Sequence, residues 1–79
     1  MLIFHKKKAM YDFCSKHNAF LCWFLKEHTE LPEKLHYVVI RNIVDSLEQD
    51  IKKLVRYKEE EQRKWIIKQV ETFVVQNKQ

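Results

Sequence analysis

Cys14 and His17 are the two side chains in this sequence best placed to do chemistry, since they stand one turn apart in a segment with helical periodicity. A cysteine and a histidine at this spacing could supply half of a zinc site, which would need two more ligands. If the first two helices form an antiparallel hairpin that turns near residue 30, His17 lies opposite Ile43, which is not a ligand. His36 then lies opposite Phe24 instead. The sequence therefore predicts no metal.

The same pair could act as a nucleophile and its base. It lacks an orienting acid, and a chain without glycine leaves little room for backbone amides to approach a substrate. The acidic residues fall on polar helix faces, so no carboxylate pair lies where its pKa would be disturbed. We therefore expect a protein that is not an enzyme and binds no cofactor. The simpler interpretation of His17 is a core histidine that is hydrogen-bonded to a carbonyl.

Lys6, Lys7 and Lys8 form a basic cluster that could contact phosphates, or could simply keep a frayed terminus soluble. The net charge of +4 and the pI near 9.1 are compatible with a nucleic acid. However, positive and negative residues alternate on the polar faces, as Arg41 and Asp45 do. No helix-turn-helix, basic-zipper or zinc-finger pattern is present.

The cysteines and the apolar runs indicate a cytoplasmic protein. Cys14 and Cys22 would lie about 12 Å apart along one helix, too far for a disulfide, so free thiols are expected. The longest apolar run, 19–25, is far shorter than the roughly 20 residues that span a bilayer. At the N-terminus the apolar residues precede the charges, the reverse of a secretory signal. Membrane association is not expected.

Composition predicts one all-α domain over residues 1–79. The chain has no glycine and one proline, which disfavours tight hairpins and therefore β structure. The first helix is expected over about 7–27, where apolar residues recur at steps of three and four. Tyr11, Cys22 and Trp23 lie outside this stripe, so the helix has more apolar surface than one contact face requires.

The second helix is expected over about 32–56, because Pro32 is favourable at a first helical position. Its apolar residues follow a heptad-like pattern with β-branched residues at one core position and leucine at the other, which suits a two-stranded coiled coil. These residues are Tyr37, Ile40, Val44, Leu47, Ile51 and Leu54. The stripe can form the core of the chain's own bundle or a seam between two chains.

A third helical segment is expected over about 60–76. The polar stretch before it contains only strong helix formers, so two architectures follow. The chain can turn near residues 57–61 and form a two- or three-helix bundle. Alternatively, residues 32–76 can form one long second helix of about 65 Å. The missing turn residues favour the continuous helix, which would need another chain to cover it.

Surplus apolar helix surface predicts a small helical protein–protein interaction module such as an adaptor, inhibitor, chaperone or regulator, assembled as a homo-oligomer, with a dimer expected. The expected interface residues are Tyr11, Trp23, Tyr37, Ile40, Val44, Leu47, Ile51, Leu54 and Trp65. The alternative is a dimeric nucleic-acid-binding regulator with Lys6, Lys7 and Lys8 on phosphates.

Overall fold

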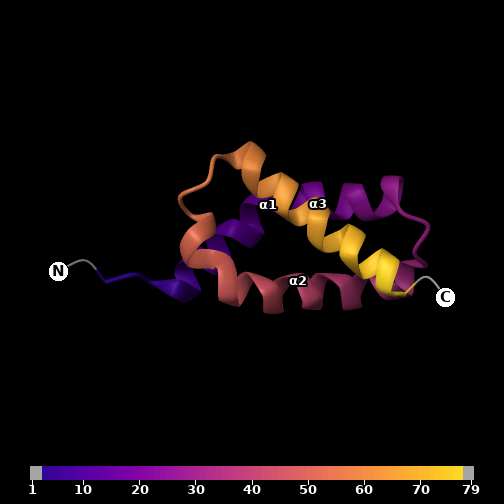
Figure 1. Cartoon of the computed structure of the whole chain (residues 1–79), viewed down its shortest axis with the longest axis horizontal. Helices are drawn as coiled ribbons and strands as arrows, with labels where there is room; N and C mark the ends of the chain where they lie inside the picture. The colour runs from indigo at the N-terminus through magenta and orange to yellow at the C-terminus, as the bar shows by residue number, and fades with distance from the viewer. Residues whose placement is uncertain (1–2, 78–79) are drawn as a thin grey trace.

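The computed structural model describes residues 3–77, which form three helices and no strand: α1 (Lys6–His28), α2 (Glu33–Leu54) and α3 (Glu59–Gln76). Each helix packs against both others. Figure 1 shows α3 crossing diagonally from the α2–α3 turn to the end of the bundle where α1 connects to α2. The all-α prediction is confirmed, with α2 similar in length to α1 rather than unusually long.

One core fills the space between the helices. Its buried apolar residues come from α1 (Phe13, Leu21, Leu25), α2 (Val39, Ile43, Leu47, Ile51, Leu54) and α3 (Ile66, Val70, Phe73). On α2 the buried stripe coincides with the expected seam only at its C-terminal half. Tyr37 points to solvent, and Ile40 and Val44 are partly buried at the margin. A helix between two neighbours must bury the side that faces both. On α2 this side includes Val39 and Ile43, which are therefore buried.

The prediction of one continuous helix over 32–76 is wrong, because the chain turns between Leu54 and Glu59. The backbone N–H of Arg56 donates to Lys53 O at 3.1 Å, and that of Tyr57 donates to Leu54 O at 3.0 Å. These tighter bonds end α2, and no described residue has a positive φ. The turn therefore forms without the glycine that usually ends a helix.

A side chain from α3 completes this turn. The Gln62 amide nitrogen donates to Leu54 O at 2.7 Å and to Tyr57 O at 3.4 Å. The last carbonyls of a helix have no partner within it. Gln62, which lies one turn into the next helix, supplies one here. No local turn residue signals this contact, which is why the sequence pattern favours the continuous helix over a turn near residues 57–61.

The connection between α1 and α2 follows local chemistry. The Thr29 hydroxyl donates to Leu25 O at 2.6 Å, and Thr29 itself is extended, which ends α1. Pro32 then stands directly before the first residue of α2, and Glu33 lies in the first turn, where the helix dipole favours a carboxylate. Within the described residues, none of the helices is apolar over a stretch long enough to cross a membrane.

The start of α3 offers a direct stability test. Lys58 occupies the N-cap position in an extended conformation and makes no side-chain capping bond. Serine there can accept a hydrogen bond from a backbone N–H of the first turn. We expect Lys58→Ser to raise the free energy of unfolding by about 1 kcal/mol, measured by urea denaturation. Lys58→Ala removes the same charge without adding a cap. An equal gain in the alanine variant would attribute the effect to charge and contradict the capping explanation.

Candidate protein-binding groove

Among the described residues, His17 and Gln62 are the polar side chains in the interior, and they contact each other. Both side chains are buried, and His17 Nε2 lies 2.7 Å from Gln62 Oε1. Because the Gln62 amide nitrogen donates to Leu54 O, its oxygen faces the imidazole, and His17 donates from Nε2. The network joins α1, α3 and the end of α2. It places His17 in the core, hydrogen-bonded to a side-chain carbonyl.

Cys14 does not share this environment. Its thiol lies on the exposed side of α1, as does that of Cys22. Partial burial raises the pKa of the Cys14 thiol, the opposite of the shift that activates a nucleophilic cysteine. No group of three His, Cys, Asp or Glu side chains within residues 3–77 is placed to hold a metal ion. The structure therefore does not bring the pair considered for chemistry into a reactive arrangement.

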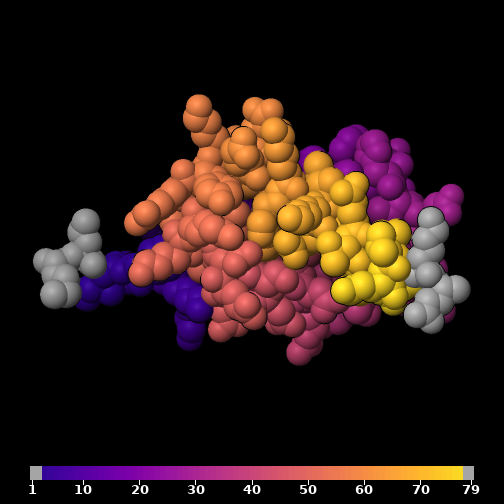
Figure 2. Space-filling view, viewed as in Figure 1, coloured from indigo at the N-terminus to yellow at the C-terminus, as the bar shows by residue number. Residues whose placement is uncertain are grey.

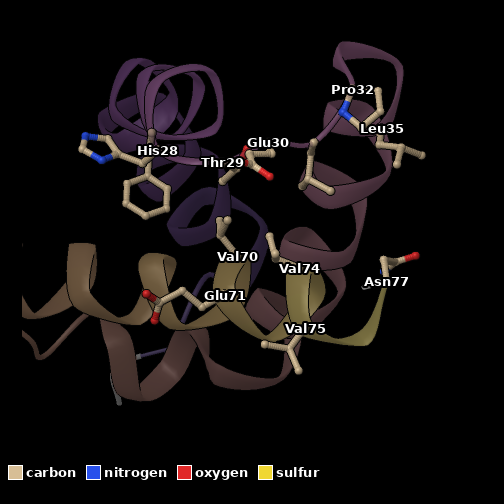
Figure 3. A pocket seen from close by; sticks show the side chains of 12 residues that line it. His28, Thr29, Glu30, Pro32, Leu35, Val70, Glu71, Val74, Val75 and Asn77 are labelled. Carbon is tan, nitrogen blue, oxygen red and sulfur yellow. The ribbon is translucent and has the colours of Figure 1, made fainter. Parts of the chain in front are cut away.

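A groove of about 870 Å³ lies at the end of the bundle where α1 connects to α2. Figure 3 shows Val70 and Val74 of α3 forming its floor, with the α1–α2 connection above them. Leu31, just before Pro32, also lines it. Val70 is buried and the other two are partly buried, so the floor belongs to the core while its upper side stays open. We call this feature the end groove.

Aromatic rings extend the end groove along α1. Phe20, Phe24 and His28 follow one another at four-residue steps and therefore share a helix face. Phe24 and His28 stack at 5.2 Å between ring centroids, and Trp23 meets His28 edge-on at 4.6 Å. Phe24 and His28 line the end groove, whereas the Trp23 ring is 52% exposed beside it. Ring contacts therefore link the exposed Trp23 to Phe24 and His28, which line the end groove.

The formally charged residues that line the end groove are all acidic. Glu30 and Glu71 are its two carboxylates, and no lysine or arginine is among its described lining residues. Both glutamates are exposed, and Figure 3 places them on opposite elements, the α1–α2 connection and α3. In a chain of net charge +4, this is a local acidic rim around an apolar floor. Such a rim favours a ligand with basic groups beside apolar ones.

The other residues expected at an interface lie away from the end groove. Tyr11 is exposed on α1, about 18 Å along the axis from Trp23, and Tyr37 is exposed on α2. Leu47, Ile51 and Leu54 are each 0% exposed within the chain's own core, which leaves them no surface for a second chain in this conformation. Ile40 and Val44 are partly buried at its margin.

Trp65 and the basic cluster are the remaining residues that the sequence predicts at a contact surface. Trp65 is partly buried, meets Phe13 edge-on and donates from its indole nitrogen to Asp50 Oδ2 at 3.1 Å. It therefore serves the packing of α1, α2 and α3. Lys6, Lys7 and Lys8 are exposed in the first turn of α1. None of the expected residues lines the end groove itself, and Trp23 lies next to it through its contact with His28.

Sequence reasoning did not identify Gln62 or the end groove. A signal for Gln62 existed, since it is the only uncharged residue in 58–64 and stands four and eight residues before Ile66 and Val70. That spacing puts it on the buried face of α3. No comparable signal marked the end groove, because its walls come from two stretches far apart in the chain, residues 24–35 and 70–77. Comparison with protein-family models, curated protein sequences and solved structures finds no match to this chain.

Proposed function

We propose that this protein is a non-catalytic interaction module whose end groove binds a protein segment that carries apolar side chains next to basic ones. The observation that carries the proposal is the apolar floor of Val70 and Val74 beneath a rim whose formal charges are the carboxylates of Glu30 and Glu71. Exposed aromatic rings at such a site are typical anchors of protein interfaces, and Trp23 fits that role.

The size of the site fits a short segment rather than a large flat surface. Its lining comes from the C-terminal end of α1, the connection to α2 and the last turns of α3. Two or three apolar side chains could reach the floor, while flanking ammonium groups pair with the rim. The rim pairs are exposed, so each adds less than about 1 kcal/mol and contributes mainly to selectivity.

A titration followed by amide NMR shifts tests this function. The probe is a synthetic peptide with a leucine and a phenylalanine followed by three lysines, and its counterpart carries three glutamates instead. We expect the lysine peptide to shift the amides of residues 28–35 and 70–77, with weaker binding as salt increases. The glutamate peptide should not bind. Equal binding of both peptides, or shifts located elsewhere, would contradict the proposal.

Trp23 gives a mutational prediction for the same assay. We expect Trp23→Ala to weaken binding of the lysine peptide by about tenfold, the loss that follows removal of an interface anchor worth about 1.4 kcal/mol. Stability should change little, since the ring is half exposed. Tyr11→Ala is the matched control, because Tyr11 is an exposed aromatic residue on the same helix but away from the end groove. A larger loss for Tyr11→Ala would place the binding surface elsewhere.

A further inference from the structure

The residues that precede α1 carry the pattern that the end groove is expected to bind. Ile3 and Phe4 are exposed, at 73% and 40%, and neither packs against the core. They are followed by His5 and by Lys6, Lys7 and Lys8 in the first turn of α1. Two apolar side chains therefore stand beside three ammonium groups. We call residues 3–8 the N-terminal arm.

The N-terminal arm and the end groove lie at opposite ends of the molecule. Figure 2 shows the first described residues projecting from one end, whereas the α1–α2 connection and the last turn of α3 lie at the other. The 23 residues of α1 separate them by about 34 Å. Ile3 and Phe4 lie within three residues of the start of α1, a span of only about 10 Å even when fully extended. An arm cannot therefore enter the groove of its own chain.

We propose that the N-terminal arm of one copy docks in the end groove of a second copy, so that the protein associates head to tail. This inference rests on the proposed function of the end groove and names its partner. Ile3 and Phe4 would cover the apolar floor. The lysines that follow would lie at the rim formed by Glu30 and Glu71.

The placement of the lysines gives independent support. The first turn of α1 has three lysines and no acidic residue, and its N-cap makes no side-chain capping bond. Positive charge at a helix N-terminus opposes the helix dipole and destabilises the helix. Carboxylates from a second chain would offset this repulsion. The α3 helix shows the usual arrangement, with three glutamates in its first turn.

The geometry of this contact differs from that of a two-fold dimer. An arm and a groove are different surfaces, so each copy keeps one free arm or groove after its first contact. Association then continues into chains or closes into a ring. The dimer seam considered from the sequence would instead pair α2 with α2, yet Leu47, Ile51 and Leu54 are covered by the chain's own helices.

Two variants separate the halves of the contact. Ile3→Asp with Phe4→Asp removes the apolar part of the arm. Glu30→Lys with Glu71→Lys reverses the rim. All four side chains are exposed, so the bundle should remain folded. The matched controls are Tyr11→Asp for the arm and Asp45→Lys with Glu48→Lys for the rim. The latter makes the same change in net charge at exposed positions outside the end groove.

Sedimentation velocity of the full chain supplies the readout. The average mass of the original protein should rise with concentration, and more salt should reduce the rise. Each double variant should weaken association by about tenfold or more, whereas the controls should not. The deciding sample is an equal mixture of the two variants. It should contain a complex of twice the 9.8 kDa chain and nothing larger, because only one arm–groove contact can form.

Several outcomes would overturn the inference. The double variants could associate as strongly as the original chain, their mixture could contain no complex, or the original chain could stay monomeric at all concentrations. If the lysine peptide still binds the end groove in the last case, the proposed function stands and its partner is another protein. If neither the lysine peptide nor the N-terminal arm binds the end groove, both the proposed function and the proposed head-to-tail contact fail. The inference would also be overturned if Ile3→Asp with Phe4→Asp abolished binding to DNA or anionic vesicles but left the average sedimentation mass unchanged.

Discussion

Replacing Leu47 with aspartate is expected to unfold the chain. Leu47 lies near the middle of α2 and is 0% exposed. The variant loses the packing of a core leucine and must bury a carboxyl group without a partner, which together cost about 5 kcal/mol or more. A single core in a chain of this size supplies only about 3–5 kcal/mol of stability. Circular dichroism should therefore show loss of helix and of a cooperative thermal transition.

Tyr37→Asp is the matched control for this prediction. Both residues belong to the stripe expected from the sequence as a seam, but Tyr37 is 68% exposed. The control variant should keep its helicity and its transition. If Leu47→Asp instead remains folded and changes only the oligomeric mass, Leu47 lies at an interface between chains and its place in the core is wrong. The pair of variants thus separates the two interpretations that periodicity left open.

The second large effect is expected at the His17–Gln62 contact. Gln62→Leu leaves the buried His17 Nε2–H without an acceptor and removes one donor from Leu54 O. An unsatisfied buried polar group costs about 1–3 kcal/mol. We expect a loss of that size for Gln62→Leu, and a similar one for His17→Leu, from urea denaturation. Gln49→Leu, on an exposed part of α2, should change stability by less than about 0.5 kcal/mol.

The double variant makes this prediction specific. Replacing both partners by apolar side chains leaves neither a donor nor an acceptor between α1 and α3. We therefore expect His17→Leu with Gln62→Leu to be less destabilising than the sum of the single variants by at least about 1 kcal/mol. Additive losses would show that the two side chains act independently, contrary to the 2.7 Å contact between them.

Much of the local structure could be predicted because its causes are local. A chain with no glycine and one proline favours helices, and the steps of three and four residues mark where they run. Pro32 indicates the start of α2, since the residue before a proline avoids helical geometry. The ends of the three helices lie within two residues of those expected from periodicity.

The candidate site could be predicted only in part. Trp23 was expected at an interface because it lies outside the apolar stripe of α1, and the structure places it beside the end groove. The floor and rim were not expected. Val74 packs against the core from α3, and Glu30 and Glu71 stand far apart in the sequence. Their grouping depends on where α3 crosses the end of α1.

The sequence by itself determined that the chain is helical and that each helix has an apolar face, because composition and periodicity act over a few residues. The tertiary structure decided that the chain turns after α2 instead of continuing as one helix, since Gln62 on the next helix adds a second donor to Leu54 O beside the Tyr57 N–H. It also decided which residues of α2 are buried. A helix between two neighbours buries the side that faces both, and that direction is set by packing rather than by periodicity.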